Sequence, residues 1–246
     1  MTTTALKIIA LITMLIDHVG AIFFPELTFL RYIGRISFPL YAFLVSEGVA
    51  HTSSKQNYAI RLIGFAILSE VPYDLAFHSS FWYPSNQNVL FELFAGMIAL
   101  WTLDSALKKK KYFNLLFVPL IAIISELLGF SYGIYGIILM VAFYLLRKIP
   151  ILSAIVGAVI TFVFNGLTQY ALFGPGSLVS VGILSLVSIG YLEVLTLNYV
   201  QLWAMLGSLF IAFYNGKEDK NGLKWLFYAV YPLHLLALWL LNAYVF

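Results

Sequence analysis

Runs of about twenty apolar residues follow one another along most of this chain, with short polar connections between them. A helix needs about 20 apolar residues to cross the hydrocarbon core of a bilayer. Hydrophobic residues make up 62% of the 246 residues and charged residues only 10%, whereas soluble domains carry about 25% charged residues. The pattern predicts an all-α fold, a polytopic bundle of transmembrane helices in which residues 1–246 form a single domain.

Ten helical segments are expected from the apolar runs and from the turn sequences that separate them, such as Pro25-Glu26 and Gly174-Pro175-Gly176. The eighth segment is short and rich in Gly and Ser. It either crosses the membrane or enters and returns on the same side, which gives ten or nine spans. The segments are residues 5–24, 30–50, 58–77, 89–107, 113–128, 132–146, 149–173, 178–193, 197–214 and 223–244.

Lysine and arginine residues occur in alternate connections, and this pattern indicates the orientation in the membrane. Lys7 lies at the start of the first helix, Lys55 in the second connection and a run of lysines at 108–111 in the fourth. Basic residues favour the cytoplasmic side, so we expect a cytoplasmic N-terminus. Lys217 lies on the cytoplasmic side, as the alternation predicts, only if the eighth segment is re-entrant. Ten spans would place this lysine outside.

Asp17 and His18 lie side by side deep in the first predicted span. An Asp at the centre of a membrane helix costs about 2.5–3.5 kcal/mol on insertion scales, and an ionisable residue at this depth is by default a functional site with a partner. Asp and His are also residue types that move protons near neutral pH. We therefore expect the function to centre on this pair.

Other charged residues are expected at a similar depth in the outer leaflet. With the N-terminus inside, Arg31 and Arg35 begin the second helix there, and Glu70 and Asp74 end the third. We predict that Arg35 pairs with Asp17, Glu70 or Asp74, because an unpaired guanidinium at that depth is costly. Structural ion pairing, snorkelling to headgroups and a Pro-kinked helix are alternative explanations. The same layer is expected to contain Glu92, Glu126 and, beside Pro232, His234.

Nine short motifs occur in order along nearly the whole chain. They are LKIIA at 6–10, MLIDHVG at 14–20, RYIGRISFP at 31–39, SEG at 46–48, RL at 61–62, SEVPYD at 69–74, NVLF at 88–91, YNGK at 214–217 and YAVYPLH at 228–234. In this combination they resemble the TraX family, most strongly in the first third of the chain and weakly over residues 149–199. The family favours Asp-Tyr-Gly after the fifth helix, where this chain has Ser131-Tyr132-Gly133.

The resemblance implies an acetyl- or acyltransferase embedded in a bacterial inner membrane, with acetyl-CoA as the donor. The implied acceptor is an amine or hydroxyl group on a pilin-like peptide N-terminus, a glycan or a lipid. Such a transfer needs a base for the acceptor proton, and positive charge or hydrogen-bond donors for the carbonyl oxygen. His18 is the expected base or acyl carrier. The expected catalytic residues are His18, Asp17, Arg35, Glu70, Asp74 and His234.

A carboxylate is expected to orient His18. Neighbours on a helix point about 100° apart, so Glu70 or Asp74 is an alternative partner, with Asp17 then bound to Arg35. Acetyl-CoA is made in the cytoplasm, and its phosphates require cations at the inner face. The expected coenzyme-binding residues are Asn215, Lys217, Lys224 and Tyr228, and no metal site is expected.

Two other classes of function are open. A proton-coupled transporter would use buried Asp, Glu and His with Pro-kinked helices equally well, although the chain has no repeated halves. A lipid-binding scaffold or assembly factor gives no reason for six or more buried charges. The net charge of +3 accompanies no basic stripe with interleaved aromatic residues, so membrane lipids are expected partners and nucleic acid is not.

Overall fold

The computed structural model describes residues 1–167, 200–217 and 224–244. Within these ranges the backbone is mainly helical, and the described part has no strand beyond an isolated bridge between Gln87 and Phe130. The all-α prediction is confirmed. The elements are α1 (Thr3–Phe23), α2 (Thr28–Gly34), α3 (Ser37–His51), α4 (Lys55–His78), α5 (Val89–Lys109), η1 (Tyr112–Leu116), α6 (Phe117–Leu127), α7 (Gly133–Leu146), α8 (Pro150–Phe162), η2 (Val163–Leu167), α11 (Ala204–Ala212) and α12 (Lys224–Tyr244).

Apolar helices dominate the described structure. Three of them, α1, α5 and the Trp225–Tyr244 part of α12, are long and apolar enough to cross a membrane, and several shorter helices are also apolar. Large apolar side chains face outward, for example those of Ile67 (63% exposed) and Leu127 (80%). An apolar outer surface of this extent indicates a membrane protein whose bundle is covered by lipid.

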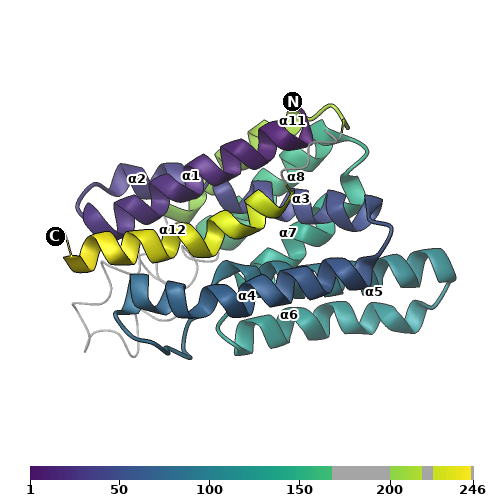
Figure 1. Ribbon diagram of the computed structural model, residues 1–246. Helices are drawn as coiled ribbons and strands as arrows, with labels where there is room; N and C mark the ends of the chain where they lie inside the picture. The colour runs from purple at the N-terminus through teal and green to yellow at the C-terminus, as the bar shows by residue number, and fades with distance from the viewer. Residues whose placement is uncertain (168–199, 218–223, 245–246) are drawn as a thin grey trace, which may run out of the picture.

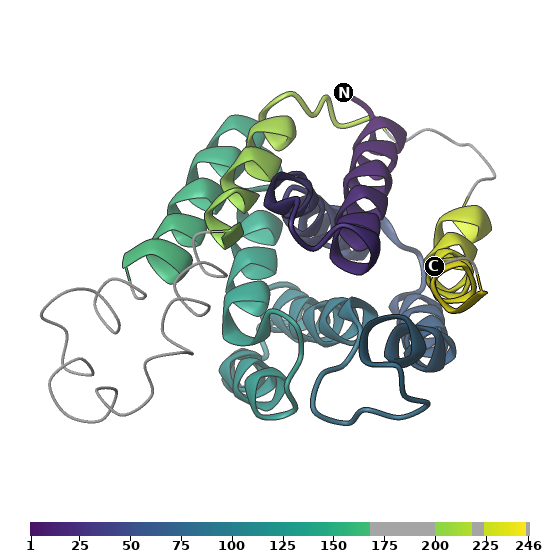
Figure 2. The ribbon, with the colours of Figure 1, turned by 90° about the vertical axis from the view of Figure 1, so that its left-hand side faces the viewer.

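The helix α3 lies at the centre of the bundle. It packs against α1, α5, α7 and α11, and Figure 2 shows it beside α1 in the interior. Its side chains Leu40, Ala42 and Phe43 are fully buried. The last helix, α12, packs against both α4 and α1 (Figure 1). The first and last helices therefore lie side by side, although they are far apart in the sequence.

The second predicted helix, residues 30–50, is divided in two in the structure. The helix α2 ends at Gly34 and α3 begins at Ser37. Pro39 has no N–H to donate to the carbonyl of Arg35, so the regular helical hydrogen-bond pattern cannot continue through this point. Ser37 Oγ instead donates to the Gly34 carbonyl at 2.8 Å. The prediction of one continuous helix is wrong here, and the break lies beside Arg35.

The other predicted segments agree with the structure to different extents. Residues 5–24, 58–77, 89–107 and 132–146 correspond to α1, α4, α5 and α7 with shifts of a few residues at their ends. The fifth segment begins with the 3₁₀ turn η1, and the seventh continues from α8 into the π-helical turn η2. The eighth segment, 178–193, lies outside the described residues, so nine against ten spans stays a prediction.

Candidate functional site

Asp17 holds two arginines in the interior of the bundle. Its side chain is 11% exposed, and Arg35 Nη2 lies 3.0 Å from Oδ2 and 3.0 Å from Oδ1. Arg31 Nη1 donates to Oδ2 at 3.1 Å and to the Asp17 carbonyl at 3.2 Å. The prediction that Arg35 pairs with a buried carboxylate is confirmed, with Asp17 as its partner. A buried carboxylate between two guanidinium groups is stable only with this geometry.

The α1–α2 hairpin places these charges together. Arg31 and Arg35 are four residues apart around the end of α2, so their side chains lie on one face. Gly34 lies between them and faces Asp17: a Cβ at this position would lie 2.1 Å from Asp17 Oδ1. Only glycine allows α2 to approach the carboxylate this closely.

His18 forms a hydrogen bond with His234 across the α1–α12 contact. The distance between His18 Nδ1 and His234 Nε2 is 2.7 Å, and His234 Nδ1 lies 2.9 Å from the Val230 carbonyl. A carbonyl can only accept, so in the neutral pair His234 carries its proton on Nδ1 and accepts at Nε2. His18 must then donate from Nδ1. This assignment leaves the lone pair of His18 at Nε2, and we call the two residues the histidine pair.

Aromatic rings surround the histidine pair. The Phe77 ring lies edge-on to His18 with centroids 5.1 Å apart, and Tyr231 lies 6.4 Å from His18 and 5.4 Å from His234. These rings restrict the orientation of both imidazoles. The structure thus places His18 and His234 together, as part of the expected catalytic set.

Glu70 and Asp74 bind the connection between α4 and α5 instead of His18. Glu70 Oε2 accepts from Asn88 N at 3.3 Å and from Asn88 Nδ2 at 2.5 Å. Asp74 Oδ2 accepts from the backbone N–H of Tyr83 at 2.8 Å. The interpretation that a carboxylate orients His18 is wrong, because His234 occupies that position.

Glu92 and Glu126 bind the beginning of α7. Glu92 Oε2 accepts from Gly133 N at 2.9 Å and from Ser125 Oγ at 3.0 Å, and Glu126 accepts from Ile134 N at 3.1 Å. Both carboxylates therefore cap unpaired N–H groups in the first turn of a helix. The predicted single polar layer is divided into the Asp17 ion pairs, the histidine pair and these structural carboxylates.

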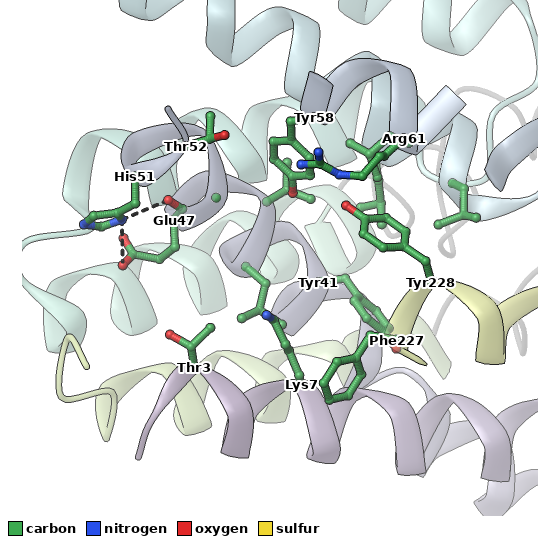
Figure 3. Close-up of a pocket in the computed structure, with 16 residues that line it drawn as sticks. Thr3, Lys7, Tyr41, Glu47, His51, Thr52, Tyr58, Arg61, Phe227 and Tyr228 are labelled. Atoms are coloured by element: carbon green, nitrogen blue, oxygen red, sulfur yellow. Dashed lines mark hydrogen bonds and ion pairs between the residues drawn. The ribbon is translucent and has the colours of Figure 1, made fainter. Parts of the chain in front are cut away.

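A cavity of about 360 Å³ lies between the beginnings of α1, α4 and α12 and the end of α3. This is the side of the bundle that the lysine pattern assigns to the cytoplasm. Figure 3 shows Lys7 and Arg61 on its walls, together with the rings of Tyr58, Phe227 and Tyr228. From the sequence, Lys7 was expected to mark orientation, and Arg61 was expected to bind the coenzyme only if the Lys217 connection lay outside the cell.

Cations and aromatic rings are in contact on these walls. Lys7 Nζ lies 5.6 Å from the centre of the Phe227 ring, and Arg61 Cζ lies 5.7 Å from that of Tyr58. Arg61 Nε is buried without a hydrogen-bond partner. At one edge of the cavity the Glu47 carboxylate accepts from the Tyr214 hydroxyl at 3.0 Å. The cavity therefore combines positive charge, stacking surfaces and one carboxylate.

The expected coenzyme residues lie in different places. Tyr228 lines the cavity, whereas Asn215 and Lys217 are not among its lining residues. Asn215 Oδ1 accepts from Lys217 N at 3.1 Å, and the Lys217 carbonyl accepts from Thr3 N at 3.1 Å. These residues join the connection after α11 to the start of α1. Lys224 begins α12, and its side chain lies outside the described part of the structure.

Comparisons with known proteins give one consistent result. The chain is 27% identical to the probable fimbrial assembly protein FimC, serogroup H1, of Dichelobacter nodosus over 253 residues, which cover 94% of this chain and 91% of that protein. It is 29% identical to protein TraX of Escherichia coli over 144 residues, 58% of this chain and 55% of that protein. No solved structure matches. The family model described as TraX protein matches residues 2–242, so the chain belongs to the TraX family.

Proposed function

We propose that this protein is a membrane-embedded acetyltransferase that moves an acetyl group from acetyl-CoA to an amine or hydroxyl acceptor. The observation that carries the proposal is the histidine pair, in which His234 fixes the tautomer of His18 and leaves His18 Nε2 as a base. A base oriented by a second group is the arrangement that acyl transfer uses. The TraX family assignment supports the same reaction class by resemblance.

The proposed reaction is a direct transfer. The acceptor nitrogen or oxygen attacks the thioester carbon while His18 Nε2 takes the acceptor proton. The tetrahedral intermediate then loses the thiolate, and protonated His18 returns the proton to the sulfur. The products are the acetylated acceptor and free coenzyme A, so that atoms and charge balance. In the alternative route His18 Nε2 attacks the thioester carbon as a nucleophile, which forms an acetyl-imidazole and releases the thiolate. The acceptor then attacks this acetyl group, His18 leaves as the neutral imidazole, and the acceptor proton ends on the thiolate.

Arg35 is the proposed electrostatic stabiliser of the oxyanion. Its Nη2 is used by Asp17, while its Nε is buried without a hydrogen-bond partner. A fixed cation with remaining donor capacity favours negative charge that develops on a carbonyl oxygen. Asp17 acts in this proposal as a positioning residue, since it holds both arginines in place.

The location and the acceptor are inferred from the basic residues and from the relatives of the chain. The resemblance to the TraX family implies a bacterial inner membrane, and the lysine pattern supports a cytoplasmic N-terminus. One relative is named a fimbrial assembly protein, which favours a pilin-like peptide N-terminus over a glycan or lipid as the acceptor. The outer-leaflet position proposed for the histidine pair suits an acceptor that reaches the protein from the membrane or from its outer face.

The test is thiol release from acetyl-CoA by purified protein in lipid nanodiscs. Release should require an acceptor, and the acceptor should gain one acetyl group by mass spectrometry; peptide amine, glycan and lipid acceptors are compared. Proton uptake into sealed vesicles is measured with the same protein, because buried histidines also suit a proton-coupled transporter. Proton movement without thiol release for any acceptor would replace the acetyltransferase proposal with the transporter.

A further inference from the structure

The cavity between the beginnings of α1, α4 and α12 is lined by the kinds of residue that bind nucleotides. Its volume of about 360 Å³ lies within the usual range of ligand pockets, about 300–1,000 Å³. Lys7 and Arg61 place positive charge on its walls, and guanidinium and ammonium groups bind phosphates through charge-assisted hydrogen bonds. Arg61 Nε is itself buried without a hydrogen-bond partner, so a phosphate in the cavity would be bound by the terminal nitrogens of this guanidinium group.

Aromatic side chains supply a stacking surface for a base. Tyr58, Phe227 and Tyr228 all line the cavity, and Figure 3 shows their rings around one space. Arg61 lies against the Tyr228 hydroxyl as well as the Tyr58 ring. Stacking of a nucleobase on such rings is worth about 1–3 kcal/mol per base.

The cavity also lies at a suitable distance from the histidine pair. Phe227 precedes His234 on α12 by about two turns, or about 10 Å along the helix axis. Tyr41, which lines the cavity, has its hydroxyl 3.9 Å from Met14 Sδ, one turn before His18. A pantetheine arm is about as long as four extended residues, about 14 Å, so it spans this separation.

Two other lysines at the same end of the bundle bind a carboxylate away from the cavity. Lys55 donates to Asp104 Oδ2, and Lys108 Nζ lies 3.0 Å from Asp104 Oδ1. Asp104 also accepts from the Tyr144 hydroxyl. These lysines form a structural cluster around one buried carboxylate and do not line the cavity, whereas Lys7 and Arg61 do.

We infer that this cavity binds the nucleotide end of coenzyme A, with Lys7 and Arg61 at the phosphates and Tyr58, Phe227 and Tyr228 around the adenine. The inference rests on the proposed function, since it names where the donor of that reaction binds. It assigns the coenzyme site to the ends of α1 and α4 and not to Lys217.

The test is equilibrium binding, which needs no turnover. Coenzyme A and adenosine 3′,5′-bisphosphate should bind the purified wild-type protein and compete with each other, whereas pantetheine and inorganic phosphate should bind far more weakly. Lys7→Gln and Arg61→Gln should each raise the Kd for coenzyme A about tenfold or more, as expected for the loss of a charge-assisted hydrogen bond. Lys108→Gln is the matched control and should leave the Kd unchanged.

Several results would overturn the site. Equal binding of pantetheine and coenzyme A would do so, as would equal competition by inorganic phosphate, which indicates a simple anion site. Unchanged Kd values for coenzyme A in folded Lys7→Gln and Arg61→Gln would also reject the site. If the wild-type protein still transferred acetyl groups, the proposed function would stand without this site. Conversely, nucleotide binding through these residues without acetyl transfer would support the site and reject the reaction. The competition arm uses only wild-type protein and is independent of the folding of any variant.

Discussion

Replacement of Asp17 by Asn should destabilise the folded protein strongly. The substitution removes the negative charge between Arg31 and Arg35 but keeps the size of the side chain. Arg35 then remains buried and charged, facing a neutral carboxamide in place of the carboxylate. Breaking a buried ion pair by removing one partner costs about 3–5 kcal/mol, because the remaining charge is buried and uncompensated.

The two arginines should contribute unequally to this loss of stability, because their side chains differ in exposure. The Arg35 side chain is 12% exposed, whereas that of Arg31 is 29% exposed and can reach polar surroundings more easily. Most of the loss should therefore come from the contact with Arg35. For a chain of this size, about 3–5 kcal/mol corresponds to a decrease in Tm of about 6–20 °C.

The assay is thermal unfolding of purified protein in detergent, followed by tryptophan fluorescence. A double-mutant cycle with Arg35→Gln isolates the pair, and its coupling energy should be at least about 1 kcal/mol. Glu26→Gln is the matched control, because Glu26 is exposed in the connection between α1 and α2. If Asp17→Asn lowers Tm no more than Glu26→Gln, or if the two substitutions of the cycle are additive, the reasoning from the buried ion pair is refuted.

Three further predictions use other parts of the structure. Gly34→Ala should cost about 1–3 kcal/mol of folding free energy in the same assay, because its Cβ would lie 2.1 Å from a carboxylate oxygen. Gly64→Ala, with open space at its Cβ, should not destabilise the protein, and equal effects of the two substitutions would contradict the clash. Asp104→Asn should destabilise the protein by about 3 kcal/mol, whereas Lys108→Gln should cost less than about 1 kcal/mol, because the Lys108 side chain is 63% exposed. A lower Tm for Lys108→Gln than for Asp104→Asn would reject the structural cluster around Asp104. His234→Phe should lower kcat for acetyl transfer at least about tenfold with little change in KM for acetyl-CoA, and an unchanged kcat would remove His234 from the mechanism.

The sequence predicted those contacts of the site that are required because buried charges need partners. A carboxylate and two arginines at one depth of a membrane bundle require each other, and Asp17 with Arg35 is the pair that forms. The helical segments were readable from apolar runs for the same reason. The break before Ser37 was missed, although Pro39 signals it, because the apolar run continues through it without interruption.

The histidine pair could not be predicted, since it depends on the packing of the first helix against the last. His18 and His234 are 216 residues apart, and no local pattern states that α1 and α12 are neighbours. Glu70 and Asp74 were expected beside His18, and the structure places them elsewhere for a different reason. Their donors include backbone N–H groups of the connection between α4 and α5. Nearly every residue carries such a group, so the sequence does not show which ones a carboxylate will bind.

The turnover of His18→Ala is the measurement that decides whether His18 is the base of an acetyl transfer. Wild-type and His18→Ala proteins are compared at saturating acetyl-CoA with the acceptor that supports thiol release. His78→Gln serves as a control outside the histidine pair, because His78 ends α4 and stacks on Tyr83. We expect His18→Ala to fold, with a lower Tm because it loses the hydrogen bond to His234, and to bind coenzyme A normally, while kcat falls by at least about 10². Wild-type turnover by a well-folded His18→Ala protein would contradict the assignment.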